Sequence, residues 1–177
     1  MSHRSPLNRV LVAGLVFTTL LAHATLGAQK APGKAPPKRA AAKAAVDAAP
    51  IDGSKLFSVT CAACHQVTGE GLGETYPPLV GSEWVTGSDA RMVRILLQGL
   101  SGPVDVAGQA YNGAMPAWGG VLKDAEIAAI ATYVRSAWGN KATPITTAAV
   151  TAIRKATASR TTPWTAPEIA QVPALVK

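Results

Sequence analysis

Two cysteines and a histidine in the segment Cys61-Ala62-Ala63-Cys64-His65 have the types and spacing for one specific chemistry. C-x-x-C-H is the attachment motif of c-type haem, in which two thiols add across the two vinyl groups of the porphyrin and form thioether bonds. In a helix, this spacing places the sulfurs about one turn apart, and the next residue projects its imidazole at the iron from the same side. The motif therefore predicts covalently bound haem c, attached through Cys61 and Cys64, with His65 as an axial ligand of the iron.

A thioredoxin-type redox pair and half of a zinc site are the other uses of a C-x-x-C pair. The first needs a βαβ setting, which the neighbouring sequence does not offer, and the second needs further Cys or His ligands. The chain has two cysteines and three histidines, and His3 and His23 lie in a leader-like segment. One motif and one usable histidine predict one haem per chain.

Methionine is the candidate for the second axial ligand, and the chain has three: the initiator, Met92 and Met115. Met115 lies between Gly113, which permits close approach of the backbone, and Pro116, which fixes φ. Met92 lies in an apolar helical pattern, where a flexible core side chain is the simpler interpretation. We predict Met115 as the ligand, with Met92 and an open or water-ligated iron as alternatives.

Further motifs surround the haem motif in a fixed order. Gly53 and Phe57 precede it, Pro77-Pro78-Leu79 follows it, and Tyr133 lies in a predicted final helix. With these motifs the chain resembles the class I c-type cytochromes, the small monohaem bacterial group, over roughly residues 51–140. The resemblance implies that Tyr133 packs against Gly53 and Phe57.

The resemblance also implies the surroundings of the haem. The Pro77 carbonyl is expected to accept a hydrogen bond from the His65 imidazole, and Leu79 to lie against the porphyrin ring. Trp118, which follows the methionine loop, is assigned to the pocket as well. The chain departs from the family in two places. At the first, Lys123 replaces the usual Ser/Thr cap of the last helix, which leaves Asp124 to stabilise the N-terminus of that helix. The second departure is a long Gly/Pro-rich stretch at residues 99–113.

Apolar residues at helical spacing predict helices at residues 51–65, with Asp52 as its cap, 89–100 and 124–138. The predicted fold class is all-α: a cytochrome c-type helical fold around one covalently bound haem, with irregular loops. Residues 141–177 form a C-terminal extension. Its pattern predicts a short helix and a strap that packs back on the haem domain, and a docking tail for a partner is the alternative. Trp164 would be the anchor in either case.

The N-terminal sequence indicates a compartment. Arg4 and Arg9 precede an apolar run and an Ala22-His23-Ala24 cleavage pattern, so residues 1–24 predict a secretory signal peptide and a periplasmic protein. A retained N-terminal anchor is the alternative. Residues 25–50, rich in Pro, Ala and Lys, predict a solvated linker, with a basic arm as its alternative.

Charge is unevenly distributed within a formal net charge of +7. The cytochrome domain at residues 51–140 carries five basic and eight acidic residues, whereas both flanking segments are basic. Nucleic acid is a poor partner for a secreted haem protein without a basic face. Contact of the basic flanks with an acidic partner or a membrane surface is credible. For docking to redox partners we favour steering by the flanks over steering by the acidic domain.

The predicted ligand set also indicates a type of function. An iron bound by His and Met has no open position, so the resemblance implies an electron carrier rather than an enzyme. Its partners would be redox proteins, a donor and an acceptor, and no organic substrate. Such domains serve as periplasmic carriers or as cytochrome subunits of periplasmic dehydrogenases or respiratory reductases. The alternative is a haem enzyme or sensor, with peroxidase or gas-binding activity, which needs an open sixth position.

Overall fold

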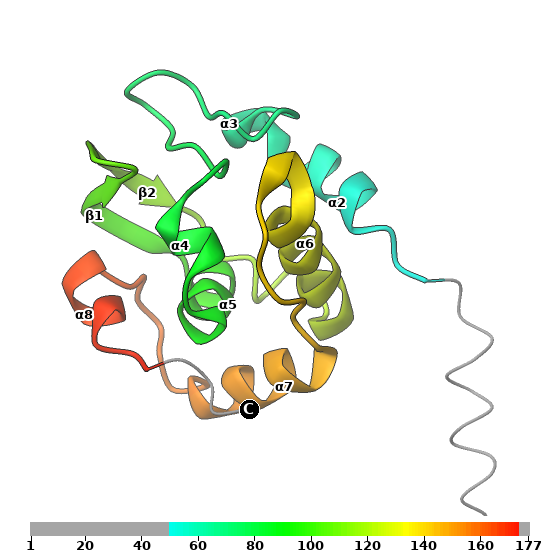
Figure 1. Ribbon diagram of the computed structural model, residues 1–177. Helices are drawn as coiled ribbons and strands as arrows, with labels where there is room; N and C mark the ends of the chain where they lie inside the picture. Colours follow the sequence, from blue (N-terminus) through cyan, green and yellow to red (C-terminus); the bar gives the residue numbers. More distant parts are fainter. Residues whose placement is uncertain (1–49, 174–177) are drawn as a thin grey trace, which may run out of the picture. The chain divides into compact units, whose positions relative to one another are not determined.

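The computed structural model describes residues 50–173 (Figure 1). The predicted signal peptide at 1–24, and all but the last residue of the predicted linker at 25–50, lie outside the described residues. In chain order the elements are α2 (Gly53–Thr60), α3 (Ala62–His65), α4 (Glu83–Thr86), α5 (Asp89–Gln98), β1 (Leu100–Val106), β2 (Gln109–Met115), α6 (Asp124–Ser136), the 3-10 turn η1 (Ala137–Gly139), α7 (Thr147–Ala156) and α8 (Ala166–Ala170). No helix among the described residues is long and apolar enough to cross a membrane.

Side-chain caps define where several helices begin. The Asp52 carboxylate accepts a hydrogen bond from the Lys55 backbone N–H at 3.0 Å, so the predicted cap of α2 is present. At α6 the Lys123 backbone N–H donates to the Glu126 carboxylate at 2.7 Å. Glu126 thus accepts a hydrogen bond from a free backbone N–H at the start of α6, while Asp124 pairs with Arg154 at 2.6 Å. A carboxylate in the first turn still suits the helix dipole.

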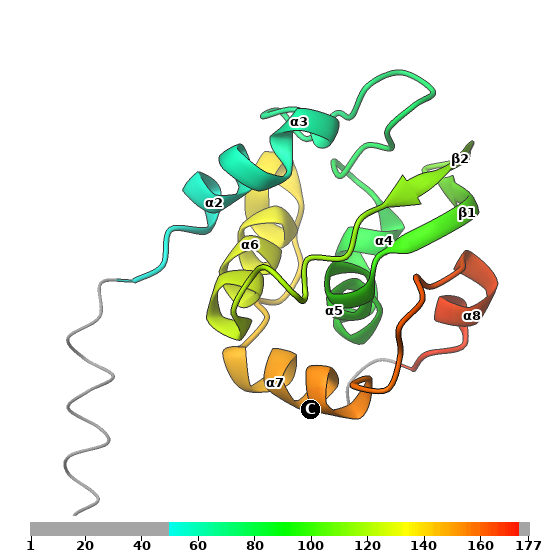
Figure 2. The same cartoon turned by 180° about the vertical axis from the view of Figure 1, so that it is seen from behind.

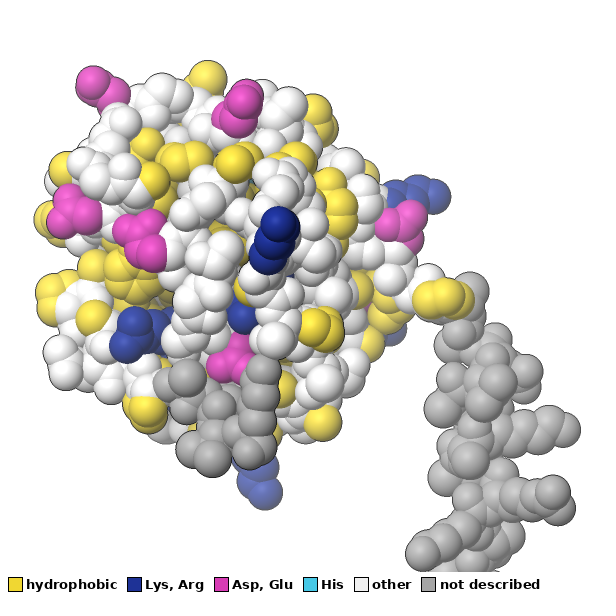
Figure 3. All heavy atoms as spheres, viewed as in Figure 1, with side chains coloured by type: hydrophobic (Ala, Val, Ile, Leu, Met, Phe, Trp, Pro, Cys, Tyr) yellow, Lys and Arg dark blue, Asp and Glu magenta, His cyan; other side chains and the backbone are white. Residues whose placement is uncertain are grey.

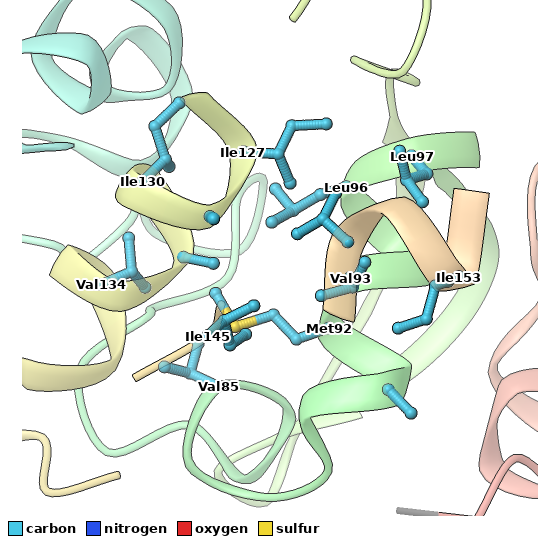
Figure 4. Close-up of a cluster of buried hydrophobic side chains, with 14 of the residues drawn as sticks. Val85, Met92, Val93, Leu96, Leu97, Ile127, Ile130, Val134, Ile145 and Ile153 are labelled. Carbon is cyan, nitrogen blue, oxygen red and sulfur yellow. The ribbon is translucent and has the colours of Figure 1, made fainter. Parts of the chain in front are cut away.

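The core lies between α5, α6 and α7, with α2 crossing α6 on the other side (Figures 1 and 4). Apolar side chains from one face of α5 meet those of α6, and α7 packs against both helices. The labelled members of this cluster are Val85, Met92, Val93, Leu96, Leu97, Ile127, Ile130, Val134, Ile145 and Ile153. Burial of this apolar surface supplies the main driving force for the helical packing.

The prediction of an all-α fold is wrong at residues 100–115, which form an antiparallel β-hairpin beside the helices (Figure 2). Leu100 pairs with Met115, and the pairing runs to Val106 and Gln109. The two-residue turn Ala107-Gly108 has positive φ at both positions, as the favoured hairpin turns require. Glycines and a proline made this stretch resemble a loop. In a two-stranded sheet each strand is an edge, so Pro103 is tolerated within it.

Gly99 explains why the helix predicted at 89–100 ends two residues early. Its φ is +82°, in the left-handed region that favours glycine and that commonly ends helices. The backbone N–H of Gly99 donates to the Ile95 carbonyl at 2.8 Å and closes the last turn of α5. The chain can then turn directly into β1.

After α6 the chain returns to the domain through α7, a connecting strap and α8. Ile153 of α7 and Ile169 of α8 are fully buried. Between the two helices, Trp164 forms an isolated parallel bridge with Leu100 of β1. The C-terminal extension therefore reaches the hairpin (Figures 1 and 2).

Candidate haem site

An apolar cavity lies between the haem motif, α4, α5, the hairpin and α6. Cys61, His65 and Ser82 are on its wall, and the other residues there are apolar or aromatic: Phe57, Pro77, Pro78, Leu79, Trp84, Val85, Met92, Ile95, Leu96, Leu100, Val104, Val106, Met115, Ile130 and Val134. Such a wall suits a large, flat and mostly apolar group.

A second cavity adjoins the first, because the two share His65, Pro77, Leu100, Val104 and Met115. Cys61 lies on the wall of the first cavity and Cys64 on that of the second. The two cysteines of the motif therefore line two adjoining cavities. His65 and Met115 line both of them.

The His65 ring is fixed by a hydrogen bond between its Nδ1 and the Pro77 carbonyl oxygen, at 3.0 Å. Because a carbonyl can only accept, Nδ1 carries the proton, and Nε2 keeps the lone pair that binds a metal. Burial lowers the pKa of the His65 imidazole, and the bond to Pro77 opposes that shift. Both the tautomer and the neutral charge suit an iron ligand.

Two glycines hold the loop that presents the Pro77 carbonyl. Gly69 and Gly71 both have φ of +72°. A Cβ at Gly69 would lie 2.5 Å from the Trp138 ring, and one at Gly71 would lie 2.7 Å from the Pro77 carbonyl carbon. The Gly71 N–H also donates to the His65 carbonyl at 3.1 Å. The loop is thereby drawn back onto α3, against the histidine.

Asn140, which the sequence analysis treated only as a domain boundary, holds the same loop from the other side. Its side chain is buried, accepts from the Gly81 N–H at 2.8 Å, and donates to the carbonyls of Leu79 (3.0 Å) and Val134 (2.9 Å). The amide thus connects the segment after Pro77 to the end of α6. An Asn shortly after a predicted helix was the only signal of this role in the sequence.

The expected contact of Tyr133 with Gly53 and Phe57 is present. The Phe57 and Tyr133 ring centroids are 5.6 Å apart, and a Cβ at Gly53 would lie 3.1 Å from that of Tyr133. Trp138 completes the cluster, at 5.1 Å from Phe57 and 5.4 Å from Tyr133. The indole of Trp138 donates to the Val67 carbonyl at 3.1 Å. These rings connect α2, the loop after the haem motif and α6.

The two candidate methionines differ in position. Met115 ends β2, is half-buried and lines both cavities together with His65. Met92 is 7% exposed and belongs to the apolar core, where Figure 4 shows it pointing from α5 into the space beside α6. It lines the first cavity only. Met115 therefore lines a cavity with each of the two motif cysteines, whereas Met92 lines a cavity with Cys61 alone.

Of the predicted pocket residues, Pro77 and Leu79 line the first cavity, and Trp118 lines neither. The Trp118 backbone N–H instead donates to the Leu96 carbonyl at 2.9 Å, which fastens the chain beyond Met115 to α5. Trp84 is the tryptophan on the cavity wall, and its indole donates to the Asp105 carbonyl of β1 at 2.8 Å. Ser82, which caps α4 two residues before Trp84, was the available sequence signal for this helix.

Charged groups are sparse around the site. Within the described part of the chain, neither cavity wall includes a Lys or an Arg, and Glu74 lines the second cavity. Arg135, in the last turn of α6, is buried and donates to the carbonyls of Val85 (2.6 Å), Gly87 (3.2 Å) and Thr143 (2.7 Å). It holds α4, and with it a wall of the cavity, against α6.

Comparison with known proteins places this arrangement in a family. Residues 48–134 match the family described as cytochrome c oxidase, cbb3-type, subunit III. Two proteins named cytochrome c-552 from Thermus thermophilus are 40% identical over 96 and 93 residues, which is 52% and 50% of this chain and 64% and 70% of theirs. The cytochrome c subunit of a quinone alcohol dehydrogenase from Gluconacetobacter polyoxogenes is 33% identical over 121 residues, 67% of this chain and 25% of that protein.

The chain therefore belongs to the cytochrome c family, and its cofactor is covalently bound haem c. It spans about two thirds of the length of the cytochromes c-552 and a quarter of the dehydrogenase subunit. The residues present fit this cofactor, because the apolar cavity and its neighbour are lined by the two motif cysteines, by an imidazole with an available Nε2 and by a thioether.

Proposed function

We propose that this chain is an electron carrier in which Cys61 and Cys64 hold the haem covalently, and His65 and Met115 bind its iron. The observation that carries the proposal is that His65 and Met115 line both adjoining cavities, of which one is also lined by Cys61 and the other by Cys64. When bound, haem supplies an iron that cycles between Fe(III) and Fe(II). The thioether of Met115 favours the reduced state, as does exclusion of water by the apolar wall.

The protein's own contribution is to hold both ligands still. The Pro77 carbonyl fixes the His65 ring, and the pairing of Leu100 with Met115 fixes the strand that ends in the thioether. Rigid ligands keep the geometry around the iron similar in both redox states, so little rearrangement accompanies electron transfer. A ligand set without an open position supports an electron carrier over a peroxidase or gas sensor.

The relatives support a setting for this carrier. Proteins named as cytochrome c subunits of quinone alcohol dehydrogenases and of a cbb3-type oxidase match it over half of its length or more. We place the chain in the periplasm, as a carrier or as the cytochrome subunit of a dehydrogenase or respiratory reductase. Residues 1–24 would be the signal peptide and 25–50 a linker, and residues 51–140 would form the haem domain, with 141–177 as its extension.

Spectroscopy with an added ligand distinguishes the carrier from the enzyme or sensor. The oxidised protein should show the long-wavelength band that marks methionine–Fe(III) ligation in the family, and the reduced protein should bind carbon monoxide slowly or not at all. A high-spin spectrum together with fast carbon monoxide binding would contradict the proposal. Purification from native membrane and periplasm would then separate a mobile carrier from a subunit of a complex.

The surface beside the cavities is the proposed contact for redox partners. It comprises residues 113–118 and the backbone of the haem motif. Figure 3 shows acidic side chains over the part of the molecule that carries the hairpin and the loop before α4. Glu74 lies on the wall of the second cavity itself. This position supports steering by the acidic domain, whereas composition alone favoured the basic flanks.

Stopped-flow reduction by a basic redox donor at low and high ionic strength tests the direction of steering. If the acidic domain steers, Glu70→Gln with Glu74→Gln should slow reduction at low salt and flatten its salt dependence. Removal of residues 25–50 should then change little. If that removal has the larger effect, the flanks steer, and salt-independent rates in every variant would leave an apolar contact.

A further inference from the structure

Trp164, in the strap between α7 and α8, holds the start of the hairpin through its backbone. Its N–H donates to the Gly99 carbonyl at 3.0 Å, and its carbonyl accepts from the Ser101 N–H at 2.8 Å. These two bonds flank Leu100 and form the parallel bridge between Leu100 and Trp164. The strap therefore acts as a short third strand on the outer edge of β1.

The side chain of Trp164 is fixed as well. Its indole N–H donates to Gln98 Oε1 at 3.2 Å, and Gln98 in turn donates to Thr157 at 2.7 Å. The Arg160 guanidinium stacks over the indole at 3.7 Å, and pairs with Glu168 of α8 at 2.9 Å. A cation over a tryptophan face is attracted by the electrons of the ring. The side chain thus joins the end of α5, the end of α7 and α8.

On its other side, the segment that Trp164 holds supports the methionine loop. Leu100 pairs with Met115 and lines both cavities. A Cβ at Gly99 would lie 2.5 Å from the Met115 carbonyl oxygen and 3.1 Å from the Ala117 N, so these backbones are in close contact. A shift of residues 99–101 would therefore move the backbone that carries the Met115 thioether.

We propose that Trp164 is a positioning residue for the iron ligand Met115: the C-terminal strap holds residues 99–101, and these hold Met115 in place. The inference rests on the proposed ligation of the iron by His65 and Met115. The proposal describes an equilibrium between a closed and an open methionine loop. An external ligand can bind the iron only when Met115 has left, so its apparent affinity reports how often the loop opens.

The test uses the full-length, haem-loaded protein and three variants. Trp164→Ala removes the indole bond and the stacking on Arg160, and Trp164→Phe keeps an aromatic ring but no donor. The matched control is Arg91→Ala, because Arg91 anchors the same extension by donating to the carbonyls of Ala170 (2.6 Å), the last residue of α8, and of Val172 (2.9 Å), just beyond it. Imidazole affinity of the oxidised protein, amide exchange at Ser101 and the global unfolding midpoint are measured for each.

We expect Trp164→Ala to raise the apparent imidazole affinity about tenfold, with Trp164→Phe in between and Arg91→Ala within about twofold of the unmutated protein. Amide exchange at Ser101 should accelerate in the Trp164 variants first. The proposal is overturned if Ser101 exchange rises in Trp164→Ala while imidazole affinity stays within twofold of the unmutated protein. It is also overturned if Arg91→Ala raises the imidazole affinity as much as Trp164→Ala does. Failure of the proposed ligation differs from both, because the unmutated protein would then lack the methionine band.

Discussion

On the His65 side of the cavity the chain is held by close contacts of particular side chains, whereas on the Met115 side it is held by backbone pairing. Gly69 and Gly71 admit Trp138 and Pro77 at distances that no Cβ would allow. Met115, in contrast, is placed by the register of a hairpin whose residues are mostly exposed.

This difference has consequences for what each side tolerates. Side chains that interlock fail abruptly when one is enlarged, because protein interiors have no spare volume. Backbone pairing is less sensitive to which residues form the strands, but depends on the elements that hold the strand edges. The His65 side should therefore respond to substitutions within its motifs, and the Met115 side to the methionine itself and to its supports.

The largest effect is expected from the attachment cysteines. Thioether bonds survive acid–acetone extraction, so the unmutated protein should keep its haem, and the double variant Cys61→Ala with Cys64→Ala should lose all of it. Single substitutions should leave one thioether or prevent maturation. Pyridine haemochrome spectra of the extracted protein provide the measurement. Complete extraction of haem from the unmutated protein would refute covalent attachment.

The second effect separates the two methionines. Met115→Ala should remove the long-wavelength band, admit external ligands and lower the reduction potential by on the order of 100 mV, since axial ligands set haem potentials over roughly 0.8 V. Met92→Leu conserves core volume and should cost less than about 1.5 kcal/mol of stability with the band unchanged. Potentiometric titration followed by absorbance tests both. The reverse pattern would assign the ligand to Met92.

A matched pair of glycines compares the two sides directly. Gly53 lies under α6, where a Cβ would collide with the Ala129 carbonyl, whereas a Cβ at Gly113 of β2 would meet nothing within 4 Å. Gly53→Ala should lower the free energy of unfolding by about 1–3 kcal/mol, as overpacking does. Gly113→Ala should stay within about 0.5 kcal/mol. If guanidinium denaturation gave equal losses of unfolding free energy for the two variants, the distinction between interlocked and paired regions would not hold.

The smallest effect concerns pH. The Thr151 hydroxyl, followed by the Arg154 guanidinium, lowers the pKa of Asp124. A depressed carboxyl pKa contributes stability above its unfolded value of about 3.9, and that contribution is lost as pH falls through the folded value. Asp124→Asn should cost about 0.2–1 kcal/mol at pH 7, as exposed ion pairs do. Denaturation curves should converge with those of the unmutated protein on acidification, and a gap that persists in acid would contradict this cause.

How much the sequence predicts also differs between the two sides. Around His65, residue identity carries the information, and the bond to Pro77 and the contact of Tyr133 with Phe57 both exist in the structure. The hairpin was missed because its turn is Ala-Gly and its strands contain Gly102, Pro103 and Gly113, which indicate a loop. Its first strand also bridges to Trp164, more than sixty residues later, and local sequence patterns do not record such contacts.

Side-chain partners from distant segments were the other gap. Asn140 binds backbone groups of Leu79 and Gly81, about sixty residues earlier. Trp84, in the short helix capped by Ser82, lines the first cavity, whereas the expected Trp118 lines neither cavity. Neither spacing nor periodicity specifies which buried polar group will satisfy a distant carbonyl. These residues had to be found in the fold.

The central claim is that His65 and Met115 bind one iron across the cavity, and methionine methyl NMR tests it most directly. The chain has three methionines, so a protein labelled at the methyl carbons gives few signals. In the reduced protein, one methyl resonance should be shifted far upfield by the porphyrin ring current. It should vanish in Met115→Leu and persist in Met92→Leu. An unshifted set of methyl signals, or loss of the shifted one in Met92→Leu alone, would contradict the account.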